Sequence, residues 1–229
     1  MNYRHAYHAG NFADLQKHAI LLTVLEALKA GSSNLSVIDT HAGAGGYDLS
    51  GEMARRSGEA EAGIFRLLQQ ADAPMVFAPL LAAVRAMNGG RDGPLYPGSP
   101  LLIAGALRRE DRYTACELRD DDFDLLRRSL APHAFAQASR ADGYETAMAK
   151  AGRGGRAFIL IDPPFERPDD YARIVEVTRQ TLSRDPAAVL AIWTPLKDLE
   201  TFDAFIRGLK PSPTMRWSPR SGFGPCWTP

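Results

Sequence analysis

The sequence predicts an α/β protein in which helices cover both faces of a mostly parallel β-sheet. Three observations support this fold class. Short apolar runs alternate with helical patterns along the chain, as in βαβ units. The apolar runs are continuous, as in strands that are buried on both faces. The 229 residues, 45% of them hydrophobic, are enough to form one sizeable core.

The predicted elements follow one another in a regular order. Helical spacing of leucine and valine predicts a first helix over 14–30. Ser99 and Pro100 are typical of the N-cap and the first position of a helix. The remaining predicted helices cover 58–70, 76–88, 121–131, a short segment ending near 150, 169–184 and 198–209, and the predicted strands cover 36–40, 113–118, 135–139, 157–161 and 187–193.

The predicted elements also suggest a division of the chain. Residues 51–97 hold predicted helices but no predicted strand, so we expect a helical insertion subdomain there. Residues 1–50 and 98–210 would then form the core. Residues 211–229 are rich in proline and follow neither period, which predicts an irregular tail.

Composition excludes several classes of protein. The formal net charge is zero, so a nucleic-acid partner would need a local basic patch. Two cysteines are too few for a disulfide framework, and Cys116 lies in an apolar run that predicts a buried thiol. The histidine spacing matches no standard zinc pattern, so we expect no metal. Without an apolar leader or a membrane-length run, we expect a soluble cytoplasmic protein.

A glycine-rich loop follows the first predicted strand in "VIDTHAGAGGY". Gly43, Gly45 and Gly46 would allow a sharp turn and a close approach of backbone to a ligand. Asp48 stands where the dinucleotide fingerprint requires glycine. With Asp39 at its head, the loop is similar to that of class I methyltransferases. An ordinary strand-to-helix turn is the alternative interpretation.

Two further acidic residues end the next two predicted strands. Glu117 could accept hydrogen bonds from ribose hydroxyls. Asp142 could accept from an adenine amino group, and Gly143 would leave room for the ring. Each acid could instead be an N-cap or a solvated turn residue. Because ligands bind at the carboxyl ends of parallel strands, three suitable strand ends together favour a nucleotide-like cofactor.

The stretch "LIDPPFE" ends the fourth predicted strand. Asp162 and the carbonyl of Pro163 could accept the two N–H hydrogens of an exocyclic amine and hold its nitrogen in line with an electrophile. Two prolines would keep these acceptors in a rigid, extended loop. Phe165 would stack on the base, which is worth about 1–3 kcal/mol in similar sites. A strand that simply ends at two prolines is the alternative.

The motif D-P-P-[YF], with a glycine loop upstream, resembles the amino-methyltransferases that use S-adenosylmethionine. "YRHAYHAGNFADLQKH", "DTHAGAGGY", "YPGSP", "ADGYE" and "LIDPPFE" together resemble the RlmJ-type family, over roughly residues 3–200. That family methylates N6 of an adenine in 23S ribosomal RNA. Phe165 replaces the commoner Tyr of the motif, and the proline-rich tail does not match the family.

The resemblance implies roles for particular residues. Asp162 would be the catalytic acceptor, and Tyr3 would contact the RNA. Arg4 lies in a basic cluster beside it, where phosphate contacts are plausible, and Pro163 and Phe165 would contact the base. The residues implied for binding S-adenosylmethionine are Lys17, His18, His41, Gly43, Ser99, Glu117, Asp142, Gly143 and Asp162.

The sequence therefore predicts a class I methyltransferase that acts on adenine N6 in 23S ribosomal RNA, on protein-free or early assembly RNA and as a monomer. Two alternatives stay open. The first is a DNA adenine-N6 or cytosine-N4 methyltransferase, because the Asp-Pro-Pro loop permits either. The second is a non-catalytic RNA-binding protein that keeps the methyltransferase fold.

Overall fold

The computed structural model describes residues 4–196 and 198–210. The chain divides into two compact units, Met1–Pro195 and Leu196–Pro229. In the second unit, helix α9 (Leu199–Leu209) begins after Asp198, whose side chain accepts a hydrogen bond from the Thr201 amide. Tyr3 and the tail predicted for 211–229 lie outside the described residues.

The first unit is built on a five-stranded sheet in the order β5-β4-β1-β6-β7, and all of its pairs are parallel. Its strands are β1 (Leu35–Asp39), β4 (Arg112–Cys116), β5 (Ala136–Ser139), β6 (Arg156–Ile161) and β7 (Val189–Ile192). Every residue of the central strand β1 is buried, as expected for a strand that is covered on both faces. The predicted fold class is confirmed.

The strand order creates a crevice at one edge of the sheet. From β1 the chain proceeds to β4 and β5 on one side, and then returns to β6 and β7 on the other. Such a reversal leaves an opening beside the carboxyl end of the first strand, where ligands bind in open α/β sheets. Asp39 ends β1, and Asp162 follows β6 directly across this opening.

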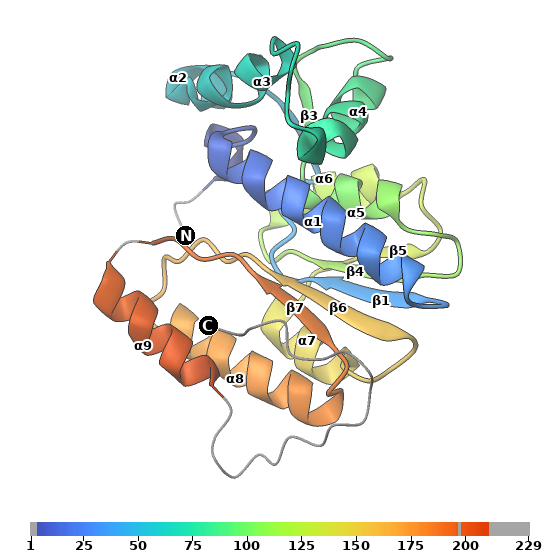
Figure 1. Ribbon diagram of the computed structural model, residues 1–229, viewed down its shortest axis with the longest axis vertical. Helices are drawn as coiled ribbons and strands as arrows, with labels where there is room; N and C mark the ends of the chain where they lie inside the picture. The colour runs from blue at the N-terminus through green and yellow to red at the C-terminus, as the bar shows by residue number, and fades with distance from the viewer. Residues whose placement is uncertain (1–3, 197, 211–229) are drawn as a thin grey trace. The chain divides into compact units, whose positions relative to one another are not determined.

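Helices cover both faces of the sheet. In Figure 1, α1, α5 and α6 lie on one face, and α7 and α8 lie on the other. Their bounds are α1 (Phe12–Ala30), α5 (Ser99–Ala106), α6 (Asp120–Leu130), α7 (Gly143–Lys150) and α8 (Asp170–Arg184). Among the described residues, no helix is both long and apolar enough to cross a membrane.

The main core lies between the sheet and the first helical layer. Leu25 of α1, Ile103 of α5 and Phe158 of β6 are fully buried there and belong to one cluster. Cys116 is also completely buried, as predicted, and burial raises the pKa of its thiol to about 11. The thiol is therefore protonated near neutral pH and is a poor nucleophile.

Residues 51–97 were expected to hold helices alone, and this expectation is wrong at their end. The short strand β3 (Leu95–Pro97) pairs antiparallel with β2 (Gly46–Asp48). Three-residue strands are too short to show an alternating pattern in the sequence. The helical elements between them are α2 (Glu52–Ser57), η2 (Glu61–Phe65), α3 (Arg66–Leu68), η3 (Met75–Phe77) and α4 (Ala78–Met87).

The helix expected over 58–70 begins only after Gly58 and is kinked at Gly63. Gly58 ends α2 in a left-handed conformation with φ of 66°. Gly63 has a non-helical backbone, and a Cβ atom there would lie 2.0 Å from the carbonyl oxygen of Gly10. Glycine at this position therefore lets the 51–97 segment pack closely on the start of the chain.

Candidate active site at the carboxyl ends of the strands

An open pocket lies at the carboxyl ends of β1, β4 and β6. Every residue that the sequence implied for cofactor binding lines it, and so does Pro163. The fold brings these residues together from distant parts of the chain, since Lys17 and Asp162 are separated by 145 positions. Arg4 and Phe165 are not among its lining residues.

The glycine loop and Glu117 form one wall of this pocket. Gly43 has φ of 66°, and its amide donates to Glu117 Oε2 at 3.0 Å. The Arg119 amide donates to Oε1 of the same carboxylate at 2.8 Å. Burial raises the pKa of Glu117, although these backbone donors oppose the shift. The carboxylate is thus oriented at the pocket wall, where its remaining lone pairs can accept hydroxyl hydrogens.

Asp39, at the start of the glycine loop, is a buried hydrogen-bond acceptor. Its side chain is fully buried, and its Oδ2 accepts hydrogen bonds from Ser99 Oγ at 2.8 Å and Tyr113 Oη at 3.4 Å. Burial raises the pKa of Asp39 to about 6. The expectation that Ser99 is an N-cap is wrong, because Gly98 occupies that position and Ser99 begins α5. The hydroxyl of Ser99 binds Asp39 instead of the helix backbone.

Asp142 is a helix N-cap that also lines the pocket. It is the N-cap of α7, and its Oδ1 accepts from the amides of Tyr144 at 2.9 Å and Glu145 at 3.3 Å. Its Oδ2 accepts from Arg173 Nη2 at 2.8 Å. Burial alone would raise the pKa of Asp142, but Arg173 and the backbone donors together lower it further than burial raises it. The carboxylate therefore caps a helix and lines the pocket at the same time.

Gly143 meets a packing requirement that the sequence did not indicate. A Cβ atom on Gly143 would lie 2.0 Å from the carbonyl oxygen of Thr40 and 2.5 Å from its Cα atom. The missing side chain therefore makes room for the backbone that leaves β1, whereas room for a ligand ring stays a prediction.

Replacing Gly143 by Ala should destabilise the fold by about 1–3 kcal/mol, because backbone must shift to admit the methyl group. Urea unfolding would measure this loss. Gly105→Ala is the matched control, since nothing lies within 4 Å of a Cβ atom at that helical position. It should be neutral or stabilising by up to about 1 kcal/mol. Equal stability of the two variants would contradict the packing argument.

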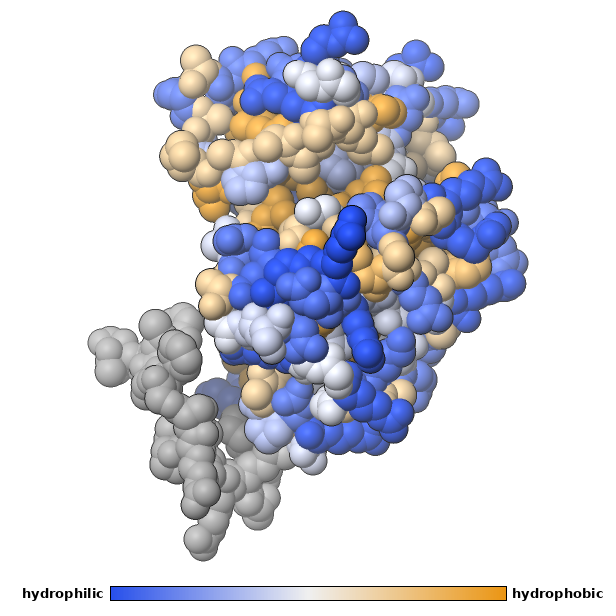
Figure 2. All heavy atoms as spheres, turned by 90° about the vertical axis from the view of Figure 1, so that its right-hand side faces the viewer, coloured by the Kyte–Doolittle hydropathy of each residue, from blue (hydrophilic) through white to orange (hydrophobic). Residues whose placement is uncertain are grey.

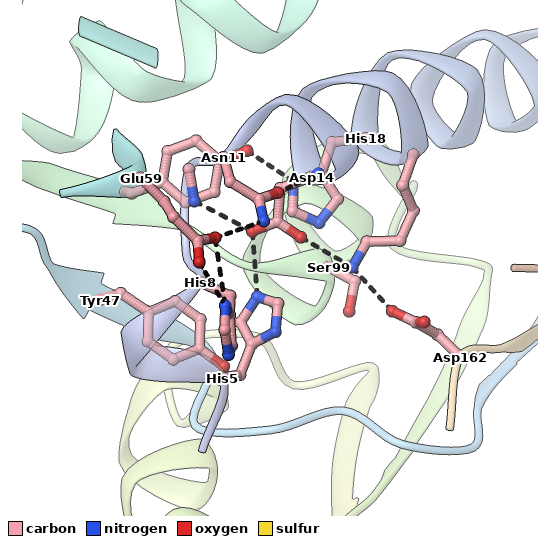
Figure 3. A network of polar contacts seen from close by, with 12 residues as sticks. His5, His8, Asn11, Asp14, His18, Tyr47, Glu59, Ser99 and Asp162 are labelled. Atoms are coloured by element: carbon pink, nitrogen blue, oxygen red, sulfur yellow. Dashed lines mark hydrogen bonds and ion pairs between the residues drawn. The ribbon is translucent and has the colours of Figure 1, made fainter. Parts of the chain in front are cut away.

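Asp162 opens the loop after β6 and faces a buried ammonium group. Its Oδ2 accepts from Lys17 Nζ at 2.7 Å, and Lys17 Nζ also lies 2.9 Å from Asp14 Oδ1 (Figure 3). Burial alone would lower the pKa of Lys17, but the two carboxylates raise it well above its usual value. Lys17 therefore stays charged and holds Asp162 in one place.

Asp14 was not among the residues predicted for the site. It is buried, and its Oδ2 accepts from the Gly10 amide at 3.0 Å and lies 3.0 Å from His5 Nε2. Burial would raise the pKa of Asp14, yet His5 and Lys17 lower it well below its usual value. Figure 3 shows this network running from the start of the chain to Asp162. In the sequence, only the spacing of Asp14 and Lys17, three residues apart on a predicted helix, could have indicated this network.

The loop after β6 is not extended throughout, contrary to what its two prolines predicted. Phe165 has φ of 51°, a left-handed conformation that is rare for a bulky residue. The centroid of its ring lies 4.9 Å from the ring centroid of Tyr171. Arg4, the other candidate substrate contact outside the pocket, forms an ion pair with Asp121 at 2.7 Å, with both side chains nearly half exposed.

His18 and His41, two of the histidines that line the pocket, are neutral near pH 7. His18 is 1% exposed, and burial lowers its pKa to about 3. Burial also lowers the pKa of His41 to about 4. His18 Nδ1 lies 2.8 Å from Tyr96 Oη, whereas its buried Nε2 has no hydrogen-bond partner within the described part of the chain. A buried polar atom without a partner in a pocket wall is suited to bind a ligand.

The unfolding free energy should depend on pH through His18. Its folded pKa of about 3 lies below its ordinary value of 6.5, so the unfolded chain binds more protons between these limits. The stability of the native protein relative to His18→Gln should therefore rise as pH increases through this window. Urea unfolding of both proteins between about pH 4.5 and 7.5 would measure it. A pH-independent difference would show that His18 is not buried as a neutral ring.

Arg173 is a second residue of the site that could not be predicted from the sequence. Besides binding Asp142, its guanidinium lies 4.5 Å above the ring centre of Tyr144. The edge of the His41 ring meets the same tyrosine ring at a centroid distance of 5.0 Å. Nothing in the helical pattern of 169–184 distinguishes this arginine from a solvated one.

A parallel sheet of this order, with a glycine loop after β1 and carboxylates at the ends of β1, β4 and β6, is the arrangement of the class I methyltransferase fold. Residues 32–216 match the model of the family described as "RsmJ: Ribosomal RNA large subunit methyltransferase D, RlmJ". The chain belongs to this family, which confirms the resemblance that its motifs indicated.

Two named relatives and one solved structure are similar to this chain over most of its length. It is 37% identical over 197 residues to the ribosomal RNA large subunit methyltransferase J of Escherichia coli, covering 86% of this chain and 70% of that protein. Identity to the Haemophilus influenzae protein of that name is 34% over 212 residues, covering 92% and 75%. A crystal structure of protein LPL1258 from Legionella pneumophila matches with a TM-score of 0.81 and 27% identity, over 88% of this chain and 74% of that one.

Proposed function

We propose that the chain transfers a methyl group from S-adenosylmethionine to N6 of an adenine in 23S ribosomal RNA, in one direct in-line step. The observation that carries this proposal is that Asp162 and Pro163 line the same pocket as Glu117 and Asp142. An amine held by Asp162 and Pro163 would therefore lie beside a cofactor held by Glu117 and Asp142. The printed names of the E. coli and H. influenzae relatives support the choice of ribosomal RNA.

The pocket fits S-adenosylmethionine chemically. Glu117 would accept from the ribose hydroxyls, and Asp142 would accept from the adenine amino group. The unpartnered Nε2 of His18 suits the amino acid end of the cofactor. Lys17, His41, Gly43, Ser99 and Gly143 would complete this site. When bound, the cofactor supplies an electrophilic methyl group on a positively charged sulfur.

Asp162 would position the nucleophile. The lone pair of the adenine amino group is delocalised into the ring, so the amine is a weak nucleophile. A carboxylate oxygen of Asp162 and the carbonyl of Pro163 would accept its two hydrogens and stabilise the positive charge that develops on nitrogen. The ion pair with Lys17 orients Asp162 for this role. The released proton would go to Asp162 or to water.

The target adenine must leave its stack to reach the pocket, which is easiest in single-stranded or distorted RNA. We therefore propose protein-free or early assembly 23S RNA in the cytoplasm as the substrate, and a monomer as the acting form. Phe165 would stack on the base once the loop after β6 rearranges, and Tyr3 and Arg4 would contact the RNA. Residues 51–97 would act as an insertion subdomain that adds RNA contacts.

The proposal is tested by offering the purified chain tritiated S-adenosylmethionine with deproteinised, unmodified 23S RNA or with duplex DNA in parallel. Both products would be digested to nucleosides. Label in N6-methyladenosine from RNA is expected. Label in DNA alone would replace the proposed substrate by DNA. Tight RNA binding without label in either product would favour a non-catalytic RNA-binding protein.

A further inference from the structure

The edge of the sheet opposite the pocket carries a group of arginines that the proposed reaction does not use. Arg112 begins β4, Arg156 begins β6, and Arg153 lies in the glycine-rich loop before β6. We call Arg112 and the segment 151–156 the arginine loop. In Figure 1 the strands begin at the right, and Figure 2 looks onto that side, where hydrophilic side chains cover much of the lower part.

The register of the sheet places two of these arginines on either side of the start of β1. Arg112 pairs with Ser36 of β1, and Arg156 pairs with the adjacent Leu35. The two arginines therefore flank the start of the central strand, about 10 Å apart at the usual strand spacing, and their side chains leave opposite faces of the sheet because successive residues alternate. A Cβ atom on Gly154 would lie 3.2 Å from Arg112 Nη1, so this guanidinium lies directly against the loop.

Arg112, Arg153 and Arg156 lack acidic partners, whereas many other arginines among the described residues have one. Arg85, Arg140 and Arg167, for example, each form an ion pair with an aspartate. Within the described part of the chain, no carboxylate lies within ion-pair distance of Arg112, Arg153 or Arg156. The Nε atom of Arg156 is buried and has no hydrogen-bond partner there either. Arg112 and Arg153 therefore carry positive charges that no ion pair neutralises in the described structure.

The neighbouring Arg108 provides a contrast on the same edge. It binds both oxygens of Asp111 and donates to the Ser32 carbonyl, so it joins two loops of the fold. Its role is structural, whereas Arg112 and Arg153 are exposed and have no such contact among the described residues.

The loop backbone adds further donors. Gly152, Gly154 and Gly155 have φ of 72°, 85° and 102°, a conformation that favours glycine. The amides of Gly154 and Gly155 donate to no other group among the described residues. Backbone amides that have no partner within the fold can donate to a bound anion. Guanidinium groups beside free amides are the chemistry that binds phosphate.

We propose that the arginine loop binds backbone phosphates of the RNA substrate, outside the base-binding pocket. This inference rests on the proposed function. Because the net charge of the chain is zero, its affinity for RNA must come from local groups of cations without ion pairs. The arginine loop is such a group. Strands of five residues span about 17 Å, so an RNA stem lying along the protein can reach both ends of the sheet.

The test compares the full chain with Arg112→Gln/Arg153→Gln, which leaves the partly buried Arg156 in place. Arg128→Gln/Arg207→Gln is the matched control, since it removes equal charge from two other exposed arginines without ion pairs in the described structure, both outside residues 51–97. For each protein, kcat and KM for RNA are measured, together with RNA affinity as a function of salt. Binding of S-adenosylmethionine and urea unfolding confirm that each variant is folded and retains its pocket.

We expect KM for RNA to rise about tenfold in the loop variant, with kcat at saturating RNA unchanged. The slope of log affinity against log salt should fall by about 0.7–0.9 for each lost phosphate contact. The control variant should behave as the unmodified chain. Equal KM and equal salt slopes in the loop and control variants would overturn the inference.

Two further outcomes distinguish the role of the arginine loop from the function of the pocket. If inorganic phosphate stabilises the unmodified chain but not the loop variant, while KM for RNA is unchanged, the loop binds a free phosphate and the RNA assignment is overturned. If the unmodified chain methylates no RNA although it binds S-adenosylmethionine, the proposed function itself fails. Loss of RNA binding in the loop variant alone would then still support the loop as an RNA contact.

Discussion

Replacing Asp162 by Ala should lower kcat for methyl transfer by at least about 10²–10³-fold, which is the usual effect of removing one group that stabilises developing charge. The substituted side chain cannot accept a hydrogen from the amine, so the nitrogen is neither aligned nor stabilised as it becomes positive. The affinity for S-adenosylmethionine should change little, because Glu117 and Asp142 remain. Single-turnover kinetics and calorimetric titration would measure the two quantities separately.

Glu166→Ala is the control for Asp162→Ala. It removes a carboxylate that lies in the same loop as Asp162 but is exposed and does not line the pocket. Its kcat should stay near that of the unmodified chain. If Asp162→Ala instead loses cofactor binding while its kcat at saturating cofactor is preserved, Asp162 is a cofactor ligand and not the group that positions the amine.

Replacing Lys17 by Met should destabilise the fold by about 3–5 kcal/mol, the usual cost of breaking a buried ion pair from one side. The Lys17 side chain is only 7% exposed, and it lies between the carboxylates of Asp14 and Asp162. Its removal leaves two negative charges close together with little solvent to screen them. Urea unfolding would measure the loss.

Two further variants test whether the charge of Lys17 is responsible. Lys29→Met removes a lysine from the same helix whose partner Glu26 is 77% exposed, so its cost should stay below about 1 kcal/mol. Lys17→Met/Asp14→Asn removes one of the uncompensated charges and should be less destabilised than the sum of the two single changes. Additive losses would show that Lys17 stabilises the fold through packing and not through its charge.

The parallel sheet and the position of the pocket could be predicted from the sequence because both depend on local patterns. Mostly apolar runs marked the strands, and a carboxylate stood at or near the end of four of them, at Asp39, Glu117, Asp142 and Asp162. Parallel strands place such residues at one edge of a sheet whatever the details of packing. The resemblance to a family then supplied residues such as Lys17 and Ser99, which no local pattern marks as ligands.

What could not be predicted depends on contacts between distant segments. The buried charge of Asp14 is stabilised by His5 and Lys17, and only the fold shows that Asp162 completes this network. Arg173 is indistinguishable from a solvated helix residue until α8 packs beside α7. The role of Gly143 likewise depends on the backbone of another element and not on its own neighbours.

A calorimetric titration of S-adenosylmethionine into the purified chain is the most decisive experiment on the pocket at the strand ends. If this pocket is the cofactor site, binding is saturable with one ligand per chain. Glu117→Gln and Asp142→Asn should each weaken this binding, while Glu166→Ala should not. A folded chain that binds no S-adenosylmethionine, or binds it equally well in all three variants, would contradict the assignment of the pocket as a cofactor site.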